Sequence, residues 1–132
     1  MVHEGGCLCG ALRFKCEGAP INVRICHCRM CQKAMGSPFF ARALFDQKAI
    51  TLTGPTGRYP TSERLERIFC PTCGSRIAAW RTNGTAAGLA LALFDDRNAF
   101  TPTEQIWTSE RIGWVADADG LPEYREGAPA LG

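Results

Sequence analysis

The stretch Cys70-Pro71-Thr72-Cys73-Gly74 decides how this chain folds, because its two cysteines need partners from elsewhere in the sequence. A similar turn, Cys7-Leu8-Cys9-Gly10, lies near the start of the chain. Two cysteines within one turn are poorly placed for a disulfide with each other, whereas they readily share a tetrahedral zinc ion. In both turns the following glycine permits the positive φ that a zinc-binding turn often requires. The spacing therefore predicts one zinc site, the first cluster, whose ligands are Cys7, Cys9, Cys70 and Cys73.

A zinc ion with four cysteine ligands has no position left for water or substrate. Its role would be structural, since it would hold the strand that follows Cys9 against the turn at Cys70. The alternative is that these are four ordinary buried cysteines. That alternative does not explain why they occur as two pairs, each followed by glycine.

The stretch Cys26-His27-Cys28-Arg29-Met30-Cys31 carries a second cluster of a different kind. Its cysteines Cys26, Cys28 and Cys31 supply three thiolates and no fourth cysteine, which leaves one coordination position open at a second zinc ion. An open zinc can bind an external thiol as the thiolate, lower its pKa and present it to an electrophile. We therefore expect these three cysteines to form a catalytic zinc site.

Two alternatives to an open second site stand beside this interpretation. His27 can be the fourth ligand, although a residue between two ligands tends to point away from the metal. A ligand from elsewhere can also close the site, in which case both zinc ions are structural. The remaining cysteine, Cys16, shares the apolar face of a strand with Leu12 and Phe14 and is expected in the core. Lys33 is expected on a solvated helix face, with a contact to a substrate carboxylate as the alternative.

The hydrophobic pattern predicts a mainly β fold with antiparallel strands, and 132 residues suffice for one domain, residues 1–132. The segments expected as strands are 11–16, 22–25, 39–44, 49–53, 66–69, 76–80, 86–94 and 104–108. One helix is expected over Arg29–Met35, ended by Gly36, and a second over 62–67. The tryptophans are expected in the core or at its rim: Trp80, Trp107 and Trp114.

Composition and charge exclude several classes of function. The formal net charge is +2, the basic residues are scattered among acidic ones, and seven thiolates on two zinc ions would make the charge slightly negative, so no nucleic-acid partner is expected. The longest nearly apolar run, 86–94, is shorter than the roughly 20 residues of a membrane-spanning helix. The first residues show no secretory signal, so a cytoplasmic location is expected, where cysteines serve as metal ligands.

Three motifs of the chain resemble those of a known family. They are Gly5-Gly6-Cys7-Leu8-Cys9-Gly10-Ala11-Leu12-Arg13-Phe14, then Cys26-His27-Cys28-Arg29-Met30-Cys31-Gln32-Lys33-Ala34-Met35-Gly36-Ser37-Pro38-Phe39, then Arg67-Ile68-Phe69-Cys70-Pro71-Thr72-Cys73-Gly74-Ser75. In this order they resemble the glutathione-dependent formaldehyde-activating (GFA) family, whose domain is shared with centromere protein V. Weaker similarity continues through Leu93-Phe94-Asp95-Asp96, Ile106-Trp107 and Trp114.

The resemblance implies a β-tent-like domain of antiparallel sheets with two Zn²⁺ ions, structural in the first cluster and catalytic in the second. It also implies glutathione as the thiol cosubstrate and formaldehyde, or a related small electrophile, as its partner. The implied activity is a carbon–sulfur lyase that forms S-hydroxymethylglutathione. The chain departs from the family at Gln105, where a histidine is expected before Ile106-Trp107. The alternative function is a non-catalytic domain with two structural zinc ions that binds a protein partner.

Overall fold

A three-stranded antiparallel sheet begins the fold in the computed structural model, which describes residues 1–128. It contains β1 (Val2–Gly6), β2 (Arg13–Glu17) and β5 (Ile50–Thr53), with β2 in the middle. Along β2 the side chains of Phe14 and Cys16 are buried, while those of Lys15 and Glu17 are exposed. This is the alternation of a strand with one buried face, as the sequence predicted.

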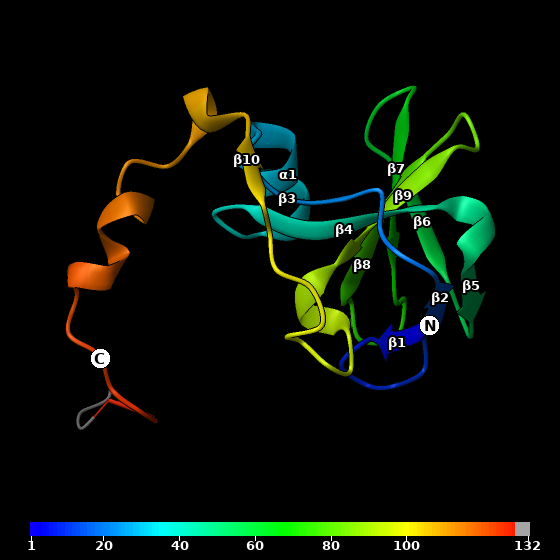
Figure 1. Ribbon diagram of the computed structural model, residues 1–132, viewed down its shortest axis with the longest axis horizontal. Helices are drawn as coiled ribbons and strands as arrows, with labels where there is room; N and C mark the ends of the chain where they lie inside the picture. Colours follow the sequence, from blue (N-terminus) through cyan, green and yellow to red (C-terminus); the bar gives the residue numbers. More distant parts are fainter. Residues whose placement is uncertain (129–132) are drawn as a thin grey trace.

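A seven-stranded sheet makes up most of the remaining fold, in the order β10-β3-β4-β9-β8-β7-β6 (Figure 1). Its strands are β3 (Asn22–Cys26), β4 (Phe40–Asp46), β6 (Gly57–Pro60), β7 (Leu65–Phe69), β8 (Arg76–Arg81), β9 (Ala86–Ala90) and β10 (Glu104–Ile106). Neighbouring strands are antiparallel except β10, which runs parallel to β3. The predicted mainly β fold is confirmed, and the parallel pair is a feature that the sequence pattern did not reveal.

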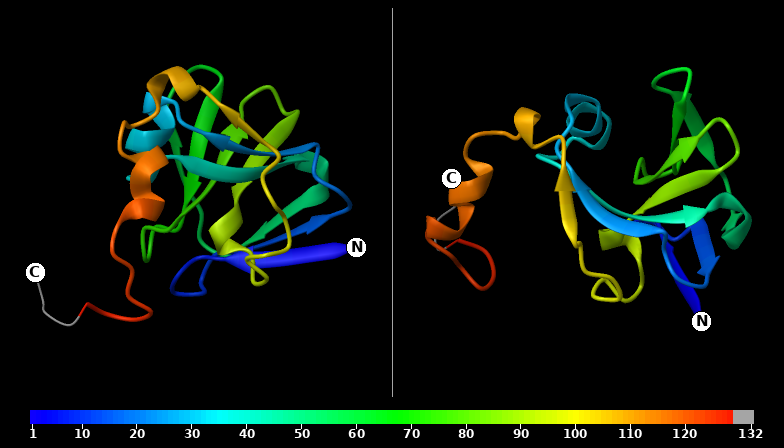
Figure 2. Two further views of the ribbon diagram at one scale, coloured as in Figure 1. Left: turned by 60° about the vertical axis from the view of Figure 1, so that its left-hand side comes forward. Right: turned by 45° about the horizontal axis from the view of Figure 1, so that its top comes forward.

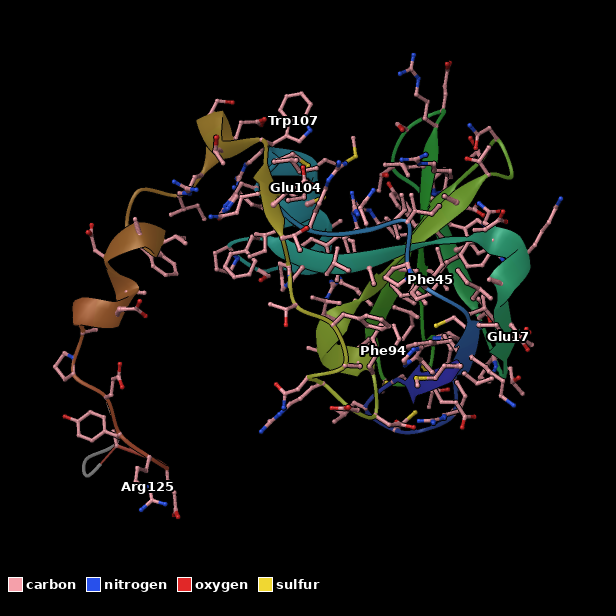
Figure 3. The ribbon with its side chains drawn as sticks, in the orientation of Figure 1. Glu17, Phe45, Phe94, Glu104, Trp107 and Arg125 are labelled. Atoms are coloured by element: carbon pink, nitrogen blue, oxygen red, sulfur yellow. The ribbon has the colours of Figure 1, made fainter. Side chains whose placement is uncertain are left out.

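Side chains from both sheets meet in one hydrophobic core. Phe14 from β2, Phe45 from β4 and Leu89 from β9 are almost fully buried in it, and Figure 3 shows Phe45 directed into the body of the fold. Every residue of β9 is buried, which explains its continuous apolar sequence. Cys7 and Cys70 belong to the same cluster of buried residues. The first cysteine cluster is therefore continuous with the core.

The helix α1 (Arg29–Met35) lies between β3 and β4 in the chain and has the predicted bounds. Cys28 is its N-cap, and the Cys28 Sγ atom accepts a hydrogen bond from the Cys31 N–H at 3.3 Å. Gly36 ends the helix with a φ of 59°, a left-handed conformation that glycine adopts without strain. The sequence around the second cluster thus sets both ends of this helix.

The helix expected over 62–67 is wrong. The Ser62 hydroxyl accepts hydrogen bonds from the N–H groups of Arg64 and Leu65, which forms a tight turn, and the chain continues from Leu65 as strand β7. The segment 86–94, expected as one strand, is a strand only as far as Ala90, where β9 ends, and a short 3₁₀ helix follows at Leu91–Leu93. Short 3₁₀ helices follow other elements at Gln47–Ala49, Leu91–Leu93, Thr108–Glu110 and Val115–Gly120.

The chain after β10 leaves the two sheets and forms an arm beside them (Figure 2). Trp107 and Trp114 are 59% and 56% exposed, so of the expected positions in the core or at its rim they do not occupy the core, whereas Trp80 is partly buried against it. Arg125 lies near the end of this arm, away from Phe45 and Phe94 (Figure 3). Within residues 1–128, every helix is too short or too polar to cross a lipid bilayer.

Candidate functional site

The two cysteine turns of the first cluster come together beside the core. Its four sulfur atoms lie within 4.8 Å of one another. The Sγ atoms of Cys7 and Cys9 are 3.6 Å apart, and those of Cys9 and Cys70 are 3.8 Å apart. A tetrahedral zinc ion with Zn–S bonds of about 2.3 Å separates its sulfur ligands by about 3.8 Å. The spacing of the sulfur atoms therefore fits a tetrahedral zinc ion.

The thiols of the first cluster differ in acidity. The Ser75 hydroxyl lies 3.2 Å from the Cys73 Sγ atom and, with the Ser75 N–H, lowers the pKa of Cys73 to about 5. The Ala11 N–H lowers the pKa of Cys9, but burial and the neighbouring cysteine sulfurs together raise it to about 11. Four thiolates this close repel one another, so a divalent cation is needed to hold all of them deprotonated. The donor set is thus suited to a metal ion.

The second cluster forms where β3 ends and α1 begins. The sulfur atoms of Cys26, Cys28 and Cys31 lie within 4.8 Å of one another, with 3.6 Å between those of Cys26 and Cys31. Burial raises the pKa of Cys26 to about 12, so this thiol also needs a cation to become a thiolate. Within residues 1–128, no fourth histidine, cysteine or carboxylate joins this group of ligand atoms. A tetrahedral ion bound here would keep one position free.

His27 does not join the second cluster but turns toward β10. Its side chain is fully buried, and its Nε2 atom lies 2.8 Å from the Gln105 Oε1 atom. Because an amide oxygen only accepts, Nε2 carries the proton. The Gln32 side chain donates to the carbonyl oxygens of His27 at 2.7 Å and Glu110 at 3.0 Å. Gln105 therefore helps to hold the loop that carries the second cluster.

Arg67 brings a buried positive charge from β7 to the second cluster. It is only 4% exposed, and its Nη2 atom donates to the Cys31 Sγ atom at 3.5 Å. Its guanidinium also lies 5.7 Å from the centre of the Phe40 ring. Burial raises the pKa of Cys31, and the hydrogen bond from Arg67 opposes that increase. Since three thiolates on one zinc ion carry a net negative charge, Arg67 is placed to offset it.

A cavity of about 590 Å³ opens between α1 and the strands β6 to β8. Its lining includes Met30, Lys33 and Ala34 from α1, Arg67 and Phe69 from β7, and Arg76 from β8. Lys33 is exposed, as expected for a solvated helix face, and it also lines this cavity. Because Arg67 both lines the cavity and contacts Cys31, a single side chain links the cavity to the second cluster.

Sequence reasoning predicted how the cysteines group together but missed Arg67. Gly10 and Gly74 have φ values of 82° and 79°, as the two turns of the first cluster required. Cys16 is fully buried in the core, also as expected. Arg67 lies in the charged run Ser62-Glu63-Arg64-Leu65-Glu66-Arg67, which is typical of a solvated surface. The signal that could have pointed to Arg67 was its place at the start of the third motif, three residues before Cys70.

Protein purified with its metal is expected to contain two zinc ions per chain and no disulfide. The eight cysteines are unpaired in the structure, and seven of them lie in the two clusters. Elemental analysis measures the metal, and thiol titration after chelation in denaturant should find all eight thiols. One zinc ion per chain, or fewer than eight thiols, would contradict the division into two metal sites.

Comparisons with known proteins agree with this geometry. The model of the glutathione-dependent formaldehyde-activating enzyme family matches residues 2–110, which include every cysteine of both clusters. An uncharacterized lyase of Schizosaccharomyces pombe (strain 972 / ATCC 24843) is 34% identical over 82 residues, or 62% of this chain. The chain spans about 60% of the length of that curated relative.

The fold also occurs in a crystal structure of a Rhodobacter sphaeroides protein. The TM-score is 0.60 at 20% identity, and the match covers 77% of this chain and 98% of that one. At this identity the similarity concerns the fold alone. The family match extends over most of the sequence and contains both cysteine clusters. This chain therefore belongs to the glutathione-dependent formaldehyde-activating enzyme family.

Proposed function

We propose that this protein is a zinc-dependent carbon–sulfur lyase that adds the thiol of glutathione to formaldehyde or a related small electrophile. The observation that carries the proposal is the second cluster, where three sulfur atoms lie together without a fourth protein ligand in residues 1–128. Family membership supports the two substrates, and the relative from Schizosaccharomyces pombe supports a lyase. We expect residues 1–132 to act as one domain in the reducing cytoplasm, where thiolate ligands persist.

The residues present suit two zinc ions with different roles. In the first cluster, four cysteines would hold a structural zinc ion, because they leave no position for a substrate. In the second cluster, a bound zinc ion would supply one open position at which a substrate sulfur is held as the thiolate near neutral pH. Cys26, Cys28 and Cys31 would be its ligands.

The proposed reaction forms one carbon–sulfur bond. The thiol sulfur attacks the carbonyl carbon, the electron pair of the π bond moves to oxygen, and the oxygen receives the proton that the thiol loses. The product carries an S–CH₂–OH group, so atoms and charges balance without an oxidant or a reductant. Lowering the pKa of the thiol raises the fraction of attacking thiolate at neutral pH.

The chain itself contributes charge balance and positioning. Arg67 donates to the Cys31 Sγ atom, and the Cys31 N–H donates to the Cys28 Sγ atom, so both contacts stabilise thiolates in this cluster. The pair formed by His27 and Gln105 anchors the loop to β10. These contacts position the sulfur atoms of Cys28 and Cys31 and the loop between Cys26 and Cys28.

Cobalt in place of zinc gives a direct test of the open position. Titration of the cobalt protein with reduced glutathione is expected to change the sulfur-to-cobalt charge-transfer and ligand-field bands, because a free thiol can bind the open position as a thiolate, whereas a thioether sulfur is a much weaker ligand. S-Methylglutathione is the matched control and should leave the bands unchanged. The zinc protein should then form S-hydroxymethylglutathione from formaldehyde faster than the uncatalysed mixture does.

The two measurements separate the parts of the proposal. Bands that respond without any excess rate would leave a thiol-binding site and rule out formaldehyde as the electrophile of this protein. Bands that do not respond to glutathione would contradict the open position, and both metal sites would then be structural.

A protein-interaction module with two structural zinc ions is the second candidate function. It is favoured by large hydrophobic side chains that the C-terminal arm leaves exposed: Trp107, Trp114, Leu121 and Tyr124. The cobalt titration distinguishes this candidate from the enzyme, since a closed second site cannot take up a thiol.

A further inference from the structure

We infer that the cavity between α1 and β7 is a binding subsite for an organic carboxylate, with Arg67 as its innermost positive charge. The inference rests on the proposed function, since it describes where the body of a substrate lies when its reacting end is at the second cluster. It assigns a ligand chemistry to a part of the molecule that the cysteine clusters do not explain.

The size of the cavity is the first reason. Its volume of about 590 Å³ lies within the range of roughly 300–1,000 Å³ that is typical of sites for whole organic ligands. Formaldehyde has two heavy atoms and would leave most of this space empty. The cavity is therefore suited to the larger part of a thiol, an electrophile or their adduct.

The charge of the lining is the second reason. Lys33, Arg67 and Arg76 come from three different elements and all line the cavity, while no carboxylate side chain of the described residues does so. The neighbouring residue Glu66 does not line the cavity, and its carboxylate pairs with Arg58. A lining with three positive side chains and, among the described residues, no carboxylate favours an anionic ligand.

The unsatisfied donors of Arg67 are the third reason. Its Nε and Nη1 atoms are buried and have no hydrogen-bond partner within residues 1–128. Among the described residues, the Arg67 side chain makes one hydrogen bond, from Nη2 to the Cys31 Sγ atom. A buried guanidinium is stabilised when its donors are satisfied, and a carboxylate can accept two of them at once. With a small shift of the side chain, a carboxylate in the cavity would supply the missing partner.

The apolar part of the lining narrows the ligand class. Met30, Ala34 and Phe69 face the same cavity and offer no hydrogen bonds from their side chains. A small inorganic anion would gain nothing from these surfaces, whereas the methylene groups of an organic acid would pack against them. The lining therefore favours a carboxylate that is attached to a carbon chain.

The carboxylate can belong to the thiol or to the electrophile, and methionine signals can distinguish the two sources. The chain has three methionines, of which Met30 lines the cavity, Met35 packs against the second cluster, and Met1 lies at the N-terminal strand. In zinc-loaded protein labelled with ¹³C-methyl methionine, S-methylglutathione should shift the Met30 signal and leave that of Met1 unchanged. Its dimethyl ester, which lacks both negative charges, should shift neither. Glyoxylate, an aldehyde with a carboxylate, tests the electrophile as the source.

Variants on two strands test the charges. Arg67→Gln should weaken the binding of the carboxylate ligand about tenfold, and Arg76→Gln about threefold because Arg76 is exposed. Arg81→Gln changes an exposed arginine of the same strand outside the cavity and should bind as the unchanged protein does. If Arg67→Gln does not fold, Arg76→Gln and the ester still decide the question.

The outcomes separate this inference from the proposed function. The subsite is supported if either carboxylate shifts the Met30 signal, if the ester does not, and if Arg76→Gln reduces the shift. This holds even if glutathione leaves the cobalt bands unchanged. No Met30 shift with either ligand, or equal shifts with acid and ester, overturns the subsite even if glutathione reaches cobalt.

Discussion

Cys73→Ser is expected to unfold the domain or to leave it insoluble. Cys73 belongs to the first cluster, which joins chain segments as far apart as Cys9 and Cys70, separated by 61 residues. Structural zinc contributes about 10–16 kcal/mol in small zinc-binding peptides, which is as large as the total stability of roughly 5–15 kcal/mol of a typical domain. Even a part of that contribution is comparable to the stability of the fold, so loss of one ligand from this cluster is expected to unfold the domain.

The position of the first cluster beside the core strengthens this expectation. Cys7 and Cys70 pack with Leu12 and Ile77 among the fully or nearly fully buried residues. Without the metal, the crowded thiols of this cluster would remain among buried apolar side chains with no ligand to compensate them, which lowers the stability of the fold. Circular dichroism and a thermal melt at matched zinc concentration measure the result. A cooperative melt near the temperature of the unchanged protein would show that the first cluster is not a structural metal site.

Much of the fold could be predicted because local sequence decides it. The helix Arg29–Met35 is bounded by a capping cysteine and by Gly36, so its ends needed no knowledge of the rest of the chain. The strand β2 shows its buried face through strict alternation. The cysteine turns carry their own glycines at positive φ. In each case the physical cause lies within a few residues.

The strands that sequence reasoning missed depend on partners elsewhere in the chain. β1 (Val2–Gly6) has two glycines and little apolar character, and it becomes a strand by pairing with β2. β6 (Gly57–Pro60) is an edge strand with three exposed residues, so it lacks the hydrophobic alternation of a half-buried strand. The segment 62–67 contains good helix formers, but pairing of β7 with β8 overrides that preference.

The grouping of the cysteines in the candidate site was predictable from the sequence, and the surroundings of the site were not. The sequence spacing groups the seven cysteines, whereas the contact between Arg67 and Cys31 spans 36 residues and that between His27 and Gln105 spans 78. Such contacts arise only when β7 and β10 are placed in the sheet. The cavity depends in the same way on the placement of α1 across from β7 and β8, because all three elements line it.

Cys28→Ser is expected to lose one zinc ion and the excess rate of S-hydroxymethylglutathione formation while the domain stays folded. The ligands of the second cluster lie within one short segment, so their metal joins little of the chain together. Cys28 is also the N-cap of α1, and serine is among the best N-cap residues, so its hydroxyl can accept the hydrogen bond from the Cys31 N–H.

Cys28→Ala is the matched control for this variant, because it removes both the ligand and the cap. It should lose the same zinc ion and the same activity, and should be less stable than Cys28→Ser by about 1 kcal/mol. Metal analysis, the rate of S-hydroxymethylglutathione formation and a thermal melt measure the three effects. If Cys28→Ser unfolds as completely as Cys73→Ser, the second cluster supports the fold as much as the first. A catalytic role for its metal would then lose its main support, because an open site that serves a substrate does not need to hold the fold together.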